Sequence, residues 1–99
     1  MRTYLLSIES TAHTFGISLI DLNFNIRCNL KEVYTTEKEG LIPCEVAKHH
    51  ENVSQYLYEK ALKETNIKEE EIIAVAVSNA PGLPPCLRVG MNLAIFFKA

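Results

Sequence analysis

Ninety-nine residues are enough for one small domain or for a piece of a larger one. The 47 % hydrophobic and 22 % charged composition excludes a disordered chain, and the formal net charge of -2 provides no general basic surface for nucleic acid. No apolar run approaches the roughly 18 residues of a membrane helix. The N-terminus also lacks the charged-then-apolar layout of a signal peptide. We therefore expect no membrane contact.

The three cysteines are Cys28, Cys44 and Cys86, which are widely spaced and form no CxxC motif. This usage is typical of buried or half-buried free thiols in a reducing cytoplasm, where we expect the chain to reside. A structural zinc site built from Cys44, His49 and His50 is disfavoured, because adjacent histidines diverge on a helix. We expect no metal site.

Alternating apolar residues predict three strands in the first third of the chain. Residues 3–9 and 15–21 carry apolar side chains two positions apart, as half-buried strands require. Residues 26–35 look extended as well, although residues 30–32 interrupt the alternation. The Asp and Asn residues at 21–25 supply turn chemistry, so we expect an antiparallel meander.

The join between the first two strands is polar and rich in hydroxyl groups, and Gly16 follows it. Such a hairpin can aim backbone N–H groups and small hydroxyls at one point, which suits an anion such as phosphate. The alternative is an ordinary hairpin whose Ser and Thr side chains bond their own backbone. From this stretch alone we favour the ordinary hairpin, because short motifs match by chance often.

The clearest helical pattern covers residues 44–65, with Pro43 suited to the first helical position. A polar loop at 36–40 precedes it, and a charged connector at 68–71 follows it. The next strand, at 71–79, is continuously apolar and β-branched, as expected for a strand covered on both faces. Because a helix of crossover length precedes this strand, we expect it to run parallel to the first one.

A second helix is predicted over residues 85–98, after a Pro- and Gly-rich loop. Gly90 and Ala94 leave a smooth strip on it, where another backbone can approach closely. The helix is apolar almost all round and must be buried on several sides. A continuation of the chain or a partner would cover Leu93, Phe96 and Phe97; a compact domain that covers its own helix is the less favoured alternative.

The fold class is therefore α/β, with an element order βββαβα that looks incomplete. Three motifs occur in sequence order along this framework: Ile8-Glu9-Ser10-Thr11-Ala12-His13-Thr14-Phe15-Gly16, Gly40-x-x-Pro43-x-Glu45-x-Ala47-x-His49-His50, and Pro81-Gly82-x-x-Pro85-x-Leu87-Arg88-Val89-Gly90. Together they resemble the N-terminal end of the tRNA threonylcarbamoyladenosine transferase family, in the archaeal form that works within the KEOPS complex. The bacterial counterpart is TsaD. The resemblance covers nearly the whole chain.

The resemblance implies a place in the actin, sugar-kinase and chaperone ATPase superfamily, whose two ribonuclease-H-like lobes close on a nucleotide and a metal. Residues 1–99 would then be the beginning of one such lobe. The family transfers threonylcarbamoyl from its adenylate to N6 of the adenosine beside the tRNA anticodon. ATP or threonylcarbamoyl-adenylate and a divalent metal are expected for the full-length family, and none of them is expected to bind this chain alone.

The resemblance also implies which residues face the cleft. The expected cleft residues are Glu9, Ser10, Thr11, His13, Thr14, Pro81 and Gly82. Glu9 and His13 would orient the acyl phosphate or its metal-bound water, as preorganised polar groups can. For His13 the alternative is a loop histidine that caps backbone groups. No residue of this chain is assigned as catalytic.

The two predicted helices resemble the helical hairpin that docks the small dimerising subunit of KEOPS. The expected contacts are Val46, His50, Val53, Leu57, Leu87, Leu93 and Phe97. The alternative for these residues is core packing between helices and sheet. The tRNA is expected to bind only in the full complex.

Several departures from the family pattern stand against full function. Ala80 and Pro84 occupy positions where the family has Gly, which makes a backbone cradle stiffer and removes an N–H donor. The family's metal-binding histidines are expected beyond residue 99. We expect an N-terminal fragment that is inactive by itself; the alternative is a truncated paralogue that serves as a non-catalytic interaction module. Whether the chain is an enzyme stays open, and an unrelated sugar-kinase lobe is a weaker third possibility.

Overall fold

The computed structural model describes the backbone of residues 3–36 and 42–98, and the side chains through residue 95. Four strands and two α-helices follow one another in the predicted order βββαβα. The elements are β1 Tyr4–Glu9, β2 Thr14–Asp21, β3 Ile26–Val33, α1 Pro43–Thr65, a short 3-10 turn Glu69–Glu71, β4 Ile72–Val77 and α2 Pro84–Lys98. These bounds lie within two residues of the predicted ranges. Most of the predicted polar loop, residues 37–40, lies outside the described part of the chain.

The four strands form one sheet in the order β3-β2-β1-β4. The first three strands make the predicted antiparallel meander, with Ile8 opposite Ile17 and Ile17 opposite Leu30. β4 pairs with β1 in the parallel direction, as the intervening helix predicted, with Ser7 opposite Ala76. The expected interruption of β3 is absent, because Glu32 keeps the inward place in the alternation and is half-buried.

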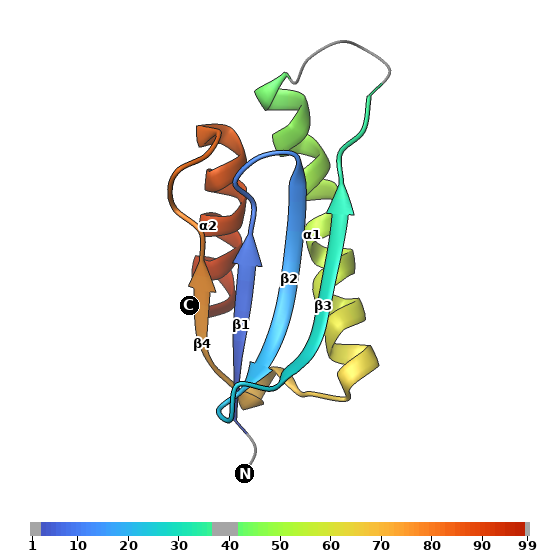
Figure 1. Cartoon of the computed structure of the whole chain (residues 1–99), viewed down its shortest axis with the longest axis vertical. Helices are drawn as coiled ribbons and strands as arrows, with labels where there is room; N and C mark the ends of the chain where they lie inside the picture. The colour runs from blue at the N-terminus through green and yellow to red at the C-terminus, as the bar shows by residue number, and fades with distance from the viewer. Residues whose placement is uncertain (1–2, 37–41, 99) are drawn as a thin grey trace.

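Both helices cover the same face of the sheet, so that the molecule has two layers (Figure 1). The core between these layers is built from the inward-facing apolar side chains of β1 and β2 and the inner stripe of α1. Its most deeply buried members are Leu6, Ile8, Phe15, Ile17, Leu19, Val46 and Leu57. α1 starts with Pro43 in its first turn and stops at Asn66, whose left-handed backbone (φ 58°) ends the helix. No described helix is both long and apolar enough to cross a membrane.

The expectation that β4 is covered on both faces is wrong for this chain. β4 is an edge strand, and no helix of the described chain lies over its second face. Ala74 and Ala76 are exposed on that face, and Ile73, at the irregularity in the pairing of β4 with β1, is 49 % exposed. A continuous apolar run therefore does not by itself establish that both faces of a strand are covered.

The strip of small residues on α2 lies against the sheet. Ala94 is buried in the core cluster, and a Cβ added to Gly90 would overlap Ser10 Oγ and approach Ile8 Cγ2 to 3.3 Å. α2 can therefore rest on the end of β1 only because residue 90 has no side chain. On its outer side the helix exposes Met91 and Ile95. The side chains of Phe96 and Phe97 lie outside the described part.

Candidate functional site

The candidate site lies at one end of the sheet, where β1 and its parallel neighbour β4 both finish. Ligands of open α/β sheets bind at the carboxyl ends of the strands, which is this edge. Two loops meet there: residues 10–13 after β1, and residues 78–83 after β4. Ser10 N donates to Ser78 Oγ at 3.1 Å, and Leu83 N donates to Thr11 O at 2.7 Å. The structure thus brings together the two loops that the first and third motifs predicted.

The N–H groups at the start of the loop already have partners inside the protein. Ser10 N is bound to Ser78, and Thr11 N donates to Glu9 Oε1 at 2.7 Å. The hydroxyl of Thr11 donates to the same carboxylate oxygen. These two N–H groups are therefore not aimed at an anion, and the ordinary-hairpin interpretation describes this part of the loop better.

Ser10 does not face a cleft. Its side chain is fully buried under Gly90 of α2, and Ser10 Oγ has no hydrogen-bond partner among the described residues. The alternation of β1 continues by one residue past the end of the strand, so Ser10 points to the same side as Ile8. The expected cleft position of Ser10 is corrected accordingly.

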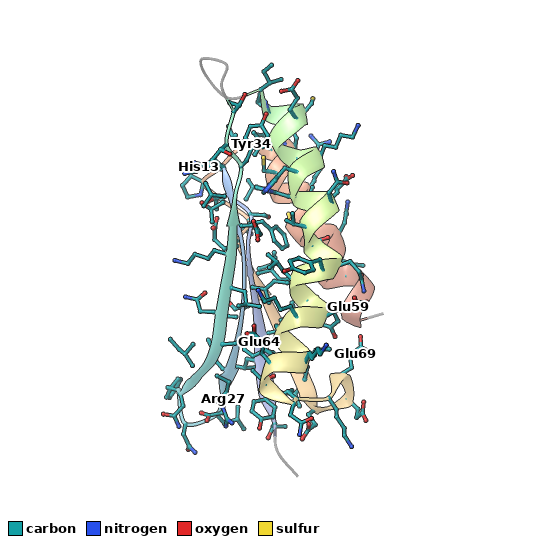
Figure 2. The ribbon with its side chains drawn as sticks, turned by 90° about the vertical axis from the view of Figure 1, so that its right-hand side faces the viewer. His13, Arg27, Tyr34, Glu59, Glu64 and Glu69 are labelled. Atoms are coloured by element: carbon teal, nitrogen blue, oxygen red, sulfur yellow. The ribbon has the colours of Figure 1, made fainter. Side chains whose placement is uncertain are left out.

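Glu9, His13, Pro81 and Gly82 are exposed, and Thr11 and Thr14 are half-buried. Figure 2 shows His13 beside Tyr34 at one end of the sheet, with Arg27 at the opposite end. Tyr34 N donates to His13 O at 2.7 Å, so the backbone of His13 is fixed while its imidazole stays accessible. Glu9 and His13 thus present a carboxylate and an imidazole to solvent at this end.

Gly82 packs directly on the backbone of the β1–β2 loop. A Cβ at this position would stand 2.6 Å from Thr11 O and 3.0 Å from Thr11 Cα. Glycine is needed here because the two loops touch through their main chains. The adjacent start of α2 is poor in donors, since Pro84 and Pro85 both lack an N–H. This helix end is therefore weak as an anion site.

His50, on the inner face of α1, contacts the β1–β2 loop from the helix side of the sheet. Its Nε2 lies 2.6 Å from Ala12 O, and its ring is fully buried and tilted against Phe15. Its Nδ1 lies 2.9 Å from His49 Nδ1. Burial lowers the pKa of His50, an effect that the hydrogen bond to Ala12 O partly opposes. Partial burial also lowers the pKa of His49, against the attraction of Glu32.

The family model of TsaD, described as tRNA N6-adenosine threonylcarbamoyltransferase, matches residues 25–98. The chain belongs to the TsaD family. The enzyme of that name from Thermofilum pendens is 43 % identical over 90 residues, which are 91 % of this chain and 27 % of that protein. The one from Staphylothermus marinus is 39 % identical over 99 residues, or 95 % and 29 %. The chain thus spans less than a third of these relatives.

The TsaD-family fold is also seen in distant solved structures. YeaZ from Pseudomonas aeruginosa superposes with a TM-score of 0.75 at 14 % identity, covering 96 % of this chain and 38 % of that one. A second structure, described as an uncharacterised protein with similarity to peptidase YeaZ, gives 0.74 at 15 % identity. The α/β fold predicted from the sequence, the beginning of a ribonuclease-H-like lobe, is confirmed.

Within the described ranges, this TsaD-family chain holds no group of three or more His, Cys, Asp or Glu side chains that could bind a metal. The divalent metal that the resemblance implies therefore finds no set of ligands among the described residues alone. The adjacent histidines do not diverge as expected, but their rings meet each other instead of a common ion. All three cysteines are free; Cys86 is buried and Cys28 half-buried, whereas Cys44 is exposed, which differs from the expectation.

The residues expected to contact a partner are mostly internal. Val46, His50, Leu57 and Leu87 are buried within the chain, so the core-packing alternative applies to them. Val53 and Leu93 are half-buried, and the side chain of Phe97 lies outside the described part. The accessible surface of the two helices is made by other residues.

Between α1 and α2 lies an open groove of about 460 Å³, lined by Cys44, Ala47, Lys48, Glu51, Pro85, Arg88, Val89 and Asn92. Arg88, Met91, Asn92 and Ile95 follow the i, i+3, i+4, i+7 spacing and form an exposed stripe along α2. That spacing is readable in the sequence. It was missed because a helix that is mostly apolar gives no preference for one face.

Proposed function

We propose that this chain supplies the N-terminal part of a tRNA N6-adenosine threonylcarbamoyltransferase and forms one wall of its substrate cleft. The observation that carries the proposal is the pair of exposed groups, Glu9 and His13, on a loop whose backbone is fixed at the carboxyl end of β1. Fixed polar groups stabilise developing charge more effectively than mobile ones, because they need no reorganisation during the reaction.

Each of the two groups has a definite part in this proposal. The Glu9 carboxylate is held toward the loop by Thr11 and presents its other oxygen to solvent. His13 is held through its carbonyl and presents its ring. Both would bind and orient the polar end of the acyl donor. The remaining ligands would come from parts of the protein outside these 99 residues, so we propose that the chain alone neither hydrolyses ATP nor modifies tRNA.

The activity test uses the natural protein that contains this chain. We expect Glu9→Gln and His13→Gln each to lower threonylcarbamoyl transfer to tRNA by at least about tenfold. Glu64→Gln is the matched control, since Glu64 is an exposed carboxylate near the far end of α1 (Figure 2). If both loop variants transfer threonylcarbamoyl as well as the original protein, the loop does not line the substrate cleft.

We also propose that α1 and α2 dock the small dimerising subunit of KEOPS. The support is the exposed stripe on α2. It carries the apolar side chains of Met91 and Ile95, and its Arg88 also lines the groove between the helices together with Lys48 of α1. Apolar and Arg side chains that lie together at a groove are typical of the centre of a protein interface.

The docking test is light scattering with size exclusion on the chain, alone and mixed with that subunit. Ile95 and Ile26 are 67 % and 66 % exposed, on α2 and on β3, and so form a matched pair. We expect Ile95→Glu to abolish the complex and Ile26→Glu to leave it intact. A monomer that ignores the subunit would end the partner assignment.

The second candidate function is a non-catalytic interaction module. It is favoured by the occupied loop N–H groups and by the two prolines at the start of α2. The two tests separate the candidates. A non-catalytic module would bind the KEOPS subunit, but its Glu9 and His13 variants would leave threonylcarbamoyl transfer to tRNA by the full complex unchanged.

A further inference from the structure

Three consecutive carbonyl oxygens fix the loop between β1 and β2, and each accepts from a different part of the chain. Thr11 O accepts from Leu83 N at 2.7 Å, Ala12 O lies 2.6 Å from His50 Nε2, and His13 O accepts from Tyr34 N at 2.7 Å. The first and third donors are backbone groups. His50 therefore supplies the side chain of this set, and its contact is the one that a side-chain substitution removes directly.

The geometry fixes the tautomers of both histidines when the pair is neutral. A carbonyl oxygen only accepts, so His50 Nε2 must carry its proton and donate to Ala12 O. The neutral ring of His50 then has a lone pair on Nδ1. His49 Nδ1 faces that lone pair at 2.9 Å, so it must be the donor. A chain of two hydrogen bonds thus runs from His49 through His50 to the loop.

The same contact limits how many protons the pair accepts. A proton added to His49 Nε2 leaves both hydrogen bonds in place, whereas a second one on His50 Nδ1 would set two N–H groups against each other. His50 is fully buried, and His49 is half-exposed against the ring of Tyr34. The charged or titratable groups that act on His50 are Glu9 from β1, His13 from the loop and His49 from its own helix; Glu32 from β3 acts on His49.

We propose that His50 is the positioning residue of the β1–β2 loop, that it stays neutral, and that His49 takes up the single proton that the pair accepts. The loop then keeps its position when the first proton binds. The tether itself is independent of the reaction proposed above; only its consequence, the placing of Glu9 and His13 toward a substrate, rests on that function.

Nuclear magnetic resonance of the natural protein containing this chain, with ¹⁵N-labelled histidine, tests the proton assignment. At neutral pH we expect the Nε2–H form for His50 and the Nδ1–H form for His49. On acidification His49 should take up the proton, and the amide signals of Ala12 and His13 should stay in place. A His50 that titrates first, or loop signals that move with the first proton, would overturn the proposal.

Two variants of His50 separate tethering from packing. Phe fills the ring volume without a donor, whereas the amide of Gln carries an N–H near the place of Nε2. In His50→Phe we expect the Tyr34 and Leu83 amides to exchange hydrogen about tenfold faster, and in His50→Gln to stay within about threefold of the original. Amides in the middle of β1 and β2 report global unfolding and provide the reference.

The outcomes of the exchange experiment decide between the two roles. If His50→Phe leaves the Tyr34 and Leu83 amides unchanged relative to the strand amides, the ring only packs and the tether is refuted. If His50→Gln is as fast as His50→Phe, the donor is not what holds the loop. Transfer activity is measured separately, so failure of the tether does not resemble failure of the proposed transferase.

Discussion

The two turns at opposite ends of β2 are held in different ways. The turn at residues 21–25 is held by its own first residue: Asp21 Oδ1 accepts from the N–H groups of Asn23 and Asn25, both at 2.9 Å. The loop at residues 10–13 is held by α1, the end of β3 and the β4–α2 loop. The first turn is set by partners two and four residues away, the second by partners 38 and 68 residues away.

This difference decides how each turn responds to change elsewhere. The Asp21 turn can form as soon as β2 and β3 pair, and it depends on nothing else. The 10–13 loop reaches its position only when both helices and β4 have packed. Long-range contacts suit a site that must be placed accurately, since the whole domain then determines its geometry.

The largest loss of stability is expected for Gly82→Ala, at the contact between the 10–13 loop and the β4–α2 loop. The added Cβ meets the backbone of Thr11 at 2.6 Å, so one of the two loops must shift. We expect a loss of about 2 kcal/mol in the free energy of unfolding, measured in urea. Gly16→Ala is the control, because its Cβ would find only ordinary contacts of 3.7 to 3.9 Å. Equal losses in the two variants would contradict the close approach.

The next effect is a pH dependence of stability that arises from His50, beneath the 10–13 loop. Burial lowers the pKa of His50 in the folded chain, so the unfolded chain binds the proton more readily. Stability should therefore fall as the pH drops below the unfolded histidine value of about 6.5, and level off below the folded pKa. The urea midpoint at about pH 5 and about pH 7.5 measures this slope. His50→Gln should reduce it; an unchanged slope would assign it to other groups.

Smaller changes in stability, of opposite sign, are expected at Ser10 and Ser78, which contact each other in space. They test the hydrogen bonds of the loop. Ser10 Oγ is buried without a described partner, so Ser10→Ala should raise stability by about 0.5 kcal/mol. Ser78 Oγ accepts from Ser10 N, so Ser78→Ala should lower it by about 1 kcal/mol. Thermal unfolding of both variants checks the signs. A loss in Ser10→Ala would mean that its hydroxyl has a partner.

The smallest effect is expected for Asp21→Asn in the self-contained turn. Backbone hydrogen bonds, first that from Asn25, lower the pKa of Asp21. The stabilisation by ionised Asp21 is present above the pKa of about 3.9 in the unfolded chain, and it is lost as the pH falls through the lower pKa of the folded chain. At neutral pH we expect the amide signals of Asn23 and Asn25 to move and those of residues 10–13 to stay in place. Shifts at residues 10–13 would show that the 21–25 turn is not self-contained.

The features that the sequence predicted are those set by local contacts, and the features that it did not predict are those set by long-range contacts. Periodicity located the strands and helices, and Asp21 with its Asn neighbours announced the turn, because those signals are local. The tether from His50 was not predictable, because helical spacing placed it on the inner stripe without saying what lies opposite. The rule that adjacent helical side chains diverge also hid the contact with His49. Ser10 was misplaced because its motif suggested a cleft, whereas Gly90, eighty residues later, covers it.

The contact of Gly90 with Ser10 also links two surfaces that lie on opposite sides of α2. The inner side of this helix touches the end of β1, and its outer side carries Arg88, Met91 and Ile95. With no side chain at residue 90, there is no flexible layer that could absorb a small sliding of the helix. A protein bound to the outer surface would thus act mechanically on the polar loop through the thickness of a single helix, and affinity on one side would be coupled to geometry on the other.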